Sequence, residues 1–322
     1  MKLDAVTRQS AGGGFGGRFY LVGYLPTYAA ALFLLVLVWA GARGPAGRPS
    51  RKISFTAAWA TASHLSLGEV VILVIGITLL AVVLQPLQLA MVRLAEGTWP
   101  AWLGTACAQR WQARRRSRLC RAAQLPSGPQ LTDEAIQRAG AAGYQLRRRF
   151  PRPDHLLRPT TLGNVLAAME DTAGRAYGLD AVTAWPRLYP VLGEQVKSLV
   201  DDRRDALDTA VRMAVTMAVT AFLSLILLLQ SSGWATLALI PLAVAVLAYN
   251  SAVQAALAYA ETVQVAFDLH RTDLLTALRM EPPREQEAER ALNEQWCDYW
   301  RQGIPLPSTI EYSPNNDETI NQ

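Results

Sequence analysis

Residues 213–260 read MAVTMAVTAFLSLILLLQSSGWATLALIPLAVAVLAYNSAVQAALAYA and contain no Asp, Glu, Lys, Arg or His. Soluble domains rarely keep so long a stretch without charge, because part of any helix formed there would face water. The stretch is about twice the roughly 20 residues that one helix needs to cross the hydrocarbon core of a bilayer. We therefore expect a hairpin of two transmembrane helices, over about 209–230 and 234–260.

Residues 19–42 and 70–92 are also free of charged residues and histidine. We expect span 1 over 19–42 and span 2 over 67–94, with a kink at Pro86. The triplet Ala40-Gly41-Ala42 resembles a signal-peptide cleavage site, but the apolar run before it exceeds the roughly 7–15 residues of such a signal. The first segment is therefore expected to remain as a span. The predicted fold is an all-α membrane protein with four transmembrane helices in two pairs and a helical cytoplasmic insert.

Composition narrows the classes of function. The chain has 322 residues, 51% of them hydrophobic, and a net charge of +5. Its three cysteines and three histidines lack Cys-x-x-Cys or His-x-x-His spacing, so we expect neither a disulfide framework nor a structural metal site. There is no Walker loop, Gly-x-Ser-x-Gly motif or kinase signature, so no class of enzyme is indicated and no cofactor is expected.

The expected domains follow from these patterns. They are a disordered tail (1–18), a transmembrane pair (19–95), a cytoplasmic helical insert (96–206), a transmembrane hairpin (207–260), cytoplasmic C-terminal helices (261–303) and a second disordered tail (304–322).

Basic residues set the expected orientation in the cell membrane. Arginines follow span 2 closely, whereas the turn between spans 3 and 4 has no basic residue. Both facts place the insert and the two termini in the cytoplasm. The loop at 43–66 opposes this orientation, because it carries four basic residues and no acid.

The insert is predicted to be helical. A good helix start at Pro159-Thr160-Thr161 precedes an i, i+3, i+4, i+7 row of apolar residues: Leu162, Val165, Leu166 and Met169. Trp185-Pro186 and Tyr189-Pro190 indicate a stiff non-helical corner, across which we expect Asp180 to pair with Arg187.

Two helices are expected to run beyond the apolar stretches. No breaker separates the insert from span 3, so one helix is predicted from about Gly193 to Leu229, and span 4 is predicted to continue towards Leu278. Beyond the corner, Leu192, Val196, Leu199 and Leu207 form an apolar face opposite the carboxylates of Asp201, Asp205 and Asp208. The C-terminal part is predicted to be helical to about Gln302.

Span 4 carries the most suggestive polar pattern. At 100° per residue, Asn250, Gln254, Glu261 and Asp268 share one side of the helix. They could line a polar conduit whose cytoplasmic mouth prefers cations. Alternatively, the amides join helix to helix by hydrogen bonds while the carboxylates sit in water.

Spans 2 and 3 offer partners for this stripe. Gln85 and Gln88 flank Pro86, and Arg212, Thr216 and Thr220 recur every four residues. The alternative for the threonines is that their hydroxyls bond backbone carbonyls one turn back.

Six arginines follow span 2: Arg110, Arg114, Arg115, Arg116, Arg118 and Arg121. Beside transmembrane helices, such a cluster is expected to contact anionic headgroups of the bilayer rather than nucleic acid.

Asp201, Asp202 and Asp205 spell DDxxD, the pattern with which prenyl-transferring enzymes hold diphosphate through Mg²⁺. A second acidic motif of the kind those enzymes need is missing. These carboxylates are therefore expected to form a solvated face, and a metal site here is only a weak candidate.

Three motifs stand in the insert: Leu162-Gly163-Asn164-Val165-Leu166, Tyr177-Gly178-Leu179-Asp180-Ala181 and Trp185-Pro186-Arg187-Leu188-Tyr189-Pro190. In these motifs the chain resembles uncharacterised multi-pass membrane proteins of high-GC bacteria. The resemblance implies a shared cytoplasmic module and carries over no activity.

The function preferred from the sequence is a homo-oligomeric channel or polar conduit that uses the stripe of span 4. The main alternative is a non-conducting membrane scaffold or signalling component that docks a cytoplasmic protein partner. A minor alternative is a lipid-linked transferase that uses the DDxxD cluster.

Overall fold

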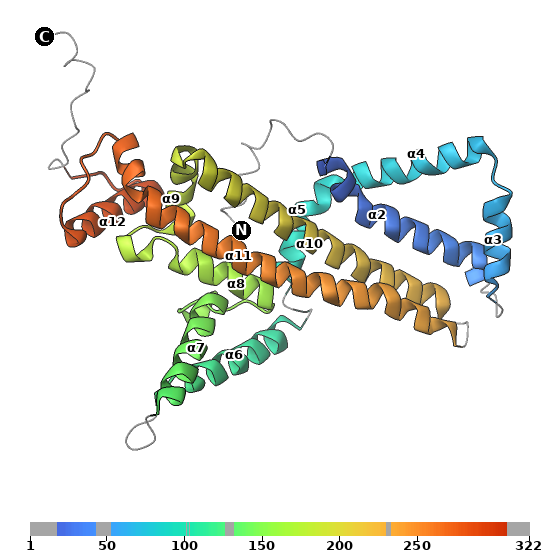
Figure 1. Ribbon diagram of the computed structural model, residues 1–322, viewed down its shortest axis with the longest axis horizontal. Helices are drawn as coiled ribbons and strands as arrows, with labels where there is room; N and C mark the ends of the chain where they lie inside the picture. The colour runs from blue at the N-terminus through green and yellow to red at the C-terminus, as the bar shows by residue number, and fades with distance from the viewer. Residues whose placement is uncertain are drawn as a thin grey trace, which may run out of the picture. The chain divides into compact units, whose positions relative to one another are not determined.

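The computed structural model describes residues 18–42, 53–100, 102, 104–125, 132–229 and 233–307 (Figure 1). These residues form helices and turns, and none of them lies in a strand. The expected all-α class is confirmed for this part of the chain. The basic residues of the 43–52 loop and nearly all of the two tails that were expected to be disordered lie outside the described residues.

Four helical segments are long and apolar enough to cross a membrane: Leu25–Ala42, Leu67–Leu84, Glu194–Leu228 and Trp234–Ala277. The protein is therefore an integral membrane protein. The kink in span 2 is confirmed, because α4 (Leu67–Leu84) gives way at Pro86 to a 3₁₀ turn, η3 (Gln85–Leu87), before α5 (Gln88–Glu96).

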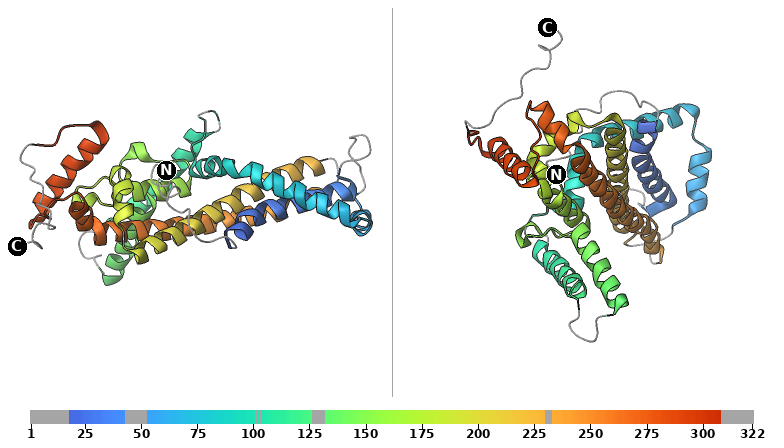
Figure 2. Two further views of the ribbon diagram at one scale, coloured as in Figure 1. Left: turned by 90° about the horizontal axis from the view of Figure 1, so that it is seen from above. Right: turned by 60° about the vertical axis from the view of Figure 1, so that its left-hand side comes forward.

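The two long helices are also confirmed. Helix α10 runs from Glu194 to Leu228 and α11 from Leu239 to Ala277. Figure 2 shows both from two further sides. At about 1.5 Å per residue, each exceeds the roughly 30 Å hydrocarbon core and continues into charged sequence.

The chain divides into two compact units. Among the described residues, unit 1 comprises 96–205 and 255–307, and unit 2 comprises 18–95 and 206–254. The boundaries fall within α10 and α11, so each of these helices contributes to both units without interruption.

Unit 2 contains α2 (Arg18–Leu37), the π-helical turn η1 (Val38–Ala42), α3 (Phe55–Ser63), α4, η3 and most of α5. It also contains the membrane parts of α10 and α11 and the turn η9 (Trp234–Ala238). Its buried side chains are mostly small or aliphatic, as in the cluster of Ala30, Met217 and Ala245. Most of the apolar side chains of α4 are exposed, as expected of a helix that faces lipid.

The prediction of a plain loop over 43–66 is wrong for residues 55–63, which form α3. Ser54 caps this helix, because its side chain accepts a hydrogen bond from the backbone N–H of Ala57. The Phe55 ring meets the Trp234 ring edge-on at 5.4 Å, which gives this short helix a partner within unit 2.

Unit 1 contains α6 (Thr105–Ala122), α7 (Asp133–Arg149), α8 (Thr161–Thr172), α9 (Ala181–Leu188) and α12 (Gln286–Gln302). Short 3₁₀ turns join them: η6 (Asp154–Leu156), η7 (Arg175–Tyr177) and η8 (Tyr189–Val191). Helix α8 forms the centre, because every residue from Leu162 to Met169 is buried. Thr160 caps α8 by accepting the amide of Gly163, so the predicted helix start is confirmed.

The predicted non-helical corner at Trp185-Pro186 is wrong. Both residues lie in α9, which Asp180 caps by accepting the amide of Thr183. The buried Trp185 ring packs against the Phe267 ring at 6.0 Å, and this contact favours the helix despite its proline.

The predicted pair between Asp180 and Arg187 is also wrong. Asp180 instead pairs with Arg301 at 3.0 Å. The Arg187 guanidinium lies over the Trp300 ring at 4.5 Å. The partners of both residues come from α12, far along the chain, which a local reading of the corner misses.

The expected faces at the start of α10 also need correction. Leu199 is 42% exposed, whereas Val200, Leu207 and Val211 are buried. Arg204 and Asp208 lie on the buried side as well, one turn apart. Asp208 therefore does not belong to a solvated face. Apolar periodicity misplaced the interface because it assumes that charged residues face water.

Candidate functional site

The four polar residues of α11 share the exposed side of the helix. Asn250, Gln254, Glu261 and Asp268 are all exposed. The neighbouring positions Val253, Leu257, Val263 and Phe267 are buried on the other side. The four side chains of the polar stripe are therefore exposed on the surface of the single chain, and none of them is buried in its core.

The two carboxylates at the acidic end of the stripe are bound by other side chains of unit 1. Arg148 of α7 forms an ion pair with Glu261 at 3.0 Å and lies over the Tyr144 ring. The Tyr177 hydroxyl donates a hydrogen bond of 2.9 Å to Asp268. Burial raises the pKa of the Tyr177 hydroxyl, and the hydrogen bond to the Asp268 carboxylate raises it further. Sequence reasoning missed both partners, because each lies some ninety or more residues away along the chain.

The amide end of the stripe differs. Among the described residues, neither Asn250 nor Gln254 has a hydrogen-bond partner for its side chain. The side chains of Gln85 and Gln88, which were expected to approach the stripe, lie outside the described part of the structure.

The polar row of span 3 is used within α10 itself. The Thr220 hydroxyl donates to the Thr216 carbonyl at 2.7 Å, and the Ser224 hydroxyl donates to the Thr220 carbonyl at 2.6 Å. Arg212, one turn before Thr216, is half-buried. The alternative in which these hydroxyls satisfy backbone carbonyls one turn back is therefore confirmed for Thr220.

The Leu162–Leu166 motif forms a tight joint at the start of α8. A Cβ on Gly163 would lie 2.1 Å from the carbonyl oxygen of Glu96, so only glycine permits this approach. The fully buried Asn164 accepts the amide of Arg158 and donates to the carbonyls of Arg158 and Thr160. These bonds fix the 158–160 turn against the start of α8.

A charged cluster lies at this joint. Arg158 pairs with Glu96 at 3.2 Å and with Glu170 at 3.1 Å. Glu96 is 1% exposed, so its charge is removed from water. A buried carboxylate of this kind needs its cation, because removing one partner of a buried pair costs about 3–5 kcal/mol.

Helix α12 docks through residues spaced four apart. Glu289 forms an ion pair with Arg271 at 2.9 Å, and Asn293 donates a hydrogen bond to the Tyr177 carbonyl at 2.8 Å. Cys297 accepts the Asp180 amide at 3.3 Å, and Arg301 pairs with the Asp180 carboxylate. Burial raises the pKa of the Cys297 thiol. This polar docking row was visible in the sequence as a four-residue spacing, but it resembles a solvated helix face.

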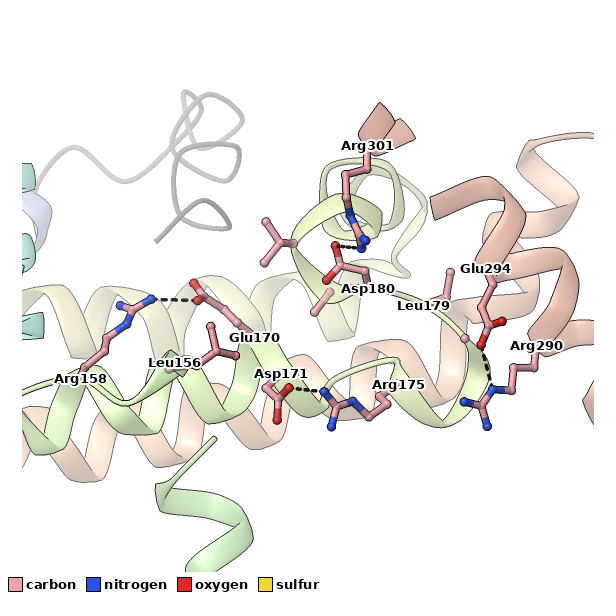
Figure 3. Close-up of a pocket in the computed structure, with 14 residues that line it drawn as sticks. Leu156, Arg158, Glu170, Asp171, Arg175, Leu179, Asp180, Arg290, Glu294 and Arg301 are labelled. Atoms are coloured by element: carbon pink, nitrogen blue, oxygen red, sulfur yellow. Dashed lines mark hydrogen bonds and ion pairs between the residues drawn. The ribbon is translucent and has the colours of Figure 1, made fainter. Parts of the chain in front are cut away.

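A pocket of about 410 Å³ opens between α8, the 178–182 segment and α12. Ala167, Leu179 and Ala181 are buried along it. Four ion pairs surround the pocket (Figure 3): Arg158–Glu170, Asp171–Arg175, Asp180–Arg301 and Arg290–Glu294. Its lining has equal numbers of arginines and carboxylates, so the charges balance within the pocket.

The DDxxD residues do not converge. The Tyr189 hydroxyl bonds Asp201 at 2.7 Å to one oxygen and 3.0 Å to the other, and Asp202 and Asp205 are exposed. Among the described residues, no group of three or more His, Cys, Asp or Glu side chains is placed to hold a metal ion.

All six predicted lipid-contacting arginines lie on α6. Arg115 and Arg116 are half-buried, and the other four are exposed: Arg110, Arg114, Arg118 and Arg121.

Comparisons with protein-family models, with curated proteins and with solved structures gave no match to this chain.

Proposed function

We propose that the protein is a non-conducting, homo-oligomeric membrane scaffold or signalling component whose unit 1 docks a protein partner. The proposal depends on one observation above all: the acidic end of the α11 stripe is already bound. A conduit that prefers cations needs free carboxylates at its mouth. Here a guanidinium lies 3.0 Å from Glu261, so a cation would meet a positive charge at that point.

The continuity of α11 supports a coupling role. One unbroken helix carries Asn250 and Gln254 in unit 2 and Glu261 and Asp268 in unit 1. Self-association through the amides would place the Arg148 and Tyr177 contacts on the same helix as the oligomer contact. A partner that binds unit 1 at these contacts would act on the helix that carries the oligomer contact.

The cost of the exposed amides supports homo-oligomerisation. An amide exposed to hydrocarbon without a hydrogen bond costs roughly 1–3 kcal/mol on protein-based scales. A second copy can relieve this cost, because an amide both donates and accepts, and the same face can pair with itself across a two-fold axis.

Disulfide cross-linking in membranes tests the association. In a chain with Cys107 and Cys120 replaced by serine, we expect Asn250→Cys to give a cross-linked dimer on oxidation. Val244→Cys is the matched control, because Val244 is exposed on the same helix about 120° from Asn250. Equal cross-linking at both positions, or none at Asn250→Cys, would reject self-association through the stripe.

The conduit is the second candidate, because unpartnered amides also suit a water-filled path between copies. Ion flux into liposomes separates the two functions. We expect no flux from the cross-linkable oligomer, across several ions and both signs of voltage. Flux that disappears in a folded Asn250→Leu/Gln254→Leu variant would establish the conduit and reject the scaffold.

A further inference from the structure

The six arginines of α6 divide into an inner pair and an outer row. Arg116 bonds Asp154, and Arg115 donates to the Thr161 hydroxyl at 3.3 Å. Gln112, which is buried on the same side, also donates to Thr161. These contacts fix the rotation of α6 about its own axis within unit 1.

The fixed rotation turns the other arginines outward. Arg110, Arg114, Arg118 and Arg121 fall within about 80° of one another around the helix. Each is exposed, and none has a hydrogen bond or ion pair among the described residues. Helix α6 carries no acidic residue that could compensate them. The row is about 16 Å long, at 1.5 Å per residue.

Two tryptophans accompany this row. Trp111, next to Arg114 and Arg118 on the helix surface, is 56% exposed, and Trp102, just before the helix, is 81% exposed. Tryptophan prefers the headgroup region of a bilayer, where its ring is partly buried and its N–H stays hydrated. Exposed tryptophan beside unpaired arginine is therefore the composition of a surface that meets lipid headgroups.

We propose that the exposed face of α6 docks on an anionic phospholipid surface through Arg110, Arg114, Arg118 and Arg121. The chain itself supplies the proximity. Only residues 85–104 separate the end of the apolar helix α4 from the start of α6. This tether keeps the row at a high effective concentration beside the bilayer that the spans occupy. The inference does not depend on the proposed scaffold function.

Cys107 offers a probe on the same face, because it is exposed one turn before Trp111. A fluorophore on Cys107, with Cys120 replaced by serine, can be read in full-length protein in nanodiscs. We expect phosphatidylcholine discs to leave the label open to an aqueous quencher. Discs with about 30% phosphatidylglycerol should shield it, and salt should reverse the shielding.

The arginines are tested as a set. Each basic residue near an anionic surface favours docking about fivefold, so replacing all four by glutamine should lower the docking equilibrium several hundredfold. Replacement by lysine should retain the shielding, because headgroup attraction requires charge rather than the guanidinium fork. The matched control removes four other exposed arginines, Arg138, Arg203, Arg279 and Arg284, and should leave the shielding in place.

Three outcomes would overturn the proposal. The first is equal shielding in discs with and without phosphatidylglycerol. The second is equal loss in the α6 variant and in the control variant, which would indicate a general effect of net charge. The third is shielding by short single-stranded RNA in phosphatidylcholine discs that requires the same four arginines, which would assign the face to nucleic acid. Circular dichroism confirms that the variants remain helical.

Discussion

Replacing Gly163 with alanine adds one methyl group at the closest approach between α8 and the end of α5. The new Cβ would lie 2.1 Å from the Glu96 carbonyl oxygen and 2.9 Å from the Thr160 hydroxyl. Because an ordinary contact between these atoms exceeds 3 Å, the backbone must move by about 1 Å. Overpacking of this kind costs roughly 1–3 kcal/mol, and a weakened cap at Thr160 adds up to about 1 kcal/mol.

The same substitution also has a favourable component, since alanine favours a helix over glycine by about 1 kcal/mol. The net expectation for Gly163→Ala is a destabilisation of roughly 0–3 kcal/mol. Gly140→Ala in α7 is the matched control, because a Cβ there meets nothing within 4 Å. It should stabilise the protein by about 0.5–1 kcal/mol.

Thermal unfolding of the full-length protein in detergent measures the difference. The buried Trp185 and Trp296 both belong to unit 1 and make tryptophan fluorescence a suitable signal. A change of 1 kcal/mol shifts Tm by about 2–4 °C in a unit of this size. The two variants should therefore move Tm in opposite directions. If Gly163→Ala raises Tm as Gly140→Ala does, the reasoning from the close approach is refuted.

Three further predictions concern pH, thiol reactivity and charge. Burial and the Asp201 carboxylate raise the pKa of Tyr189 in the folded protein, so above about pH 10 the unfolded chain loses this proton first and the free energy of unfolding falls. Chemical unfolding at several alkaline pH values should show a smaller fall for Tyr189→Phe than for the unmodified protein. An equal fall in both would contradict the assignment. Maleimide followed by mass spectrometry should modify the exposed Cys107 quickly and Cys297 only after unfolding, because burial and a raised pKa both suppress its thiolate; equal rates would argue against the docked α12. Glu261→Gln should lower the free energy of unfolding by less than about 1 kcal/mol, and only at low salt, because the ion pair with Arg148 that it breaks is half-exposed. A larger loss that does not depend on salt would show that the pair is buried in the assembled protein.

The membrane-spanning parts of this fold were predictable because composition alone determines them. Long charge-free runs have few soluble alternatives, and Pro86 interrupts span 2 by removing a backbone donor. Helix α10 was also predictable within one residue at each end, since no glycine or proline interrupts it between Glu194 and Leu228.

The packing of unit 1 was harder to predict, because its partners lie far apart in sequence. Nothing local distinguishes Asp208 on the buried side of α10 from a solvated carboxylate. Nothing local links Arg148 to Glu261 either. Pro186 argues against a helix by propensity, yet burial of Trp185 outweighs one missing hydrogen bond.

The composition of unit 1 from two chain segments has a consequence for biosynthesis. The Tyr177 carbonyl accepts a hydrogen bond from the side chain of Asn293, which follows 116 residues later in the chain. At roughly 5–20 residues per second, translation delivers that partner about 6–23 s after Tyr177 itself. During this interval the ribosome makes the whole hairpin of spans 3 and 4. Unit 1 is therefore completed only after the hairpin has been synthesised, and a nascent chain stalled before α12 should present the 174–183 segment to chaperones and proteases.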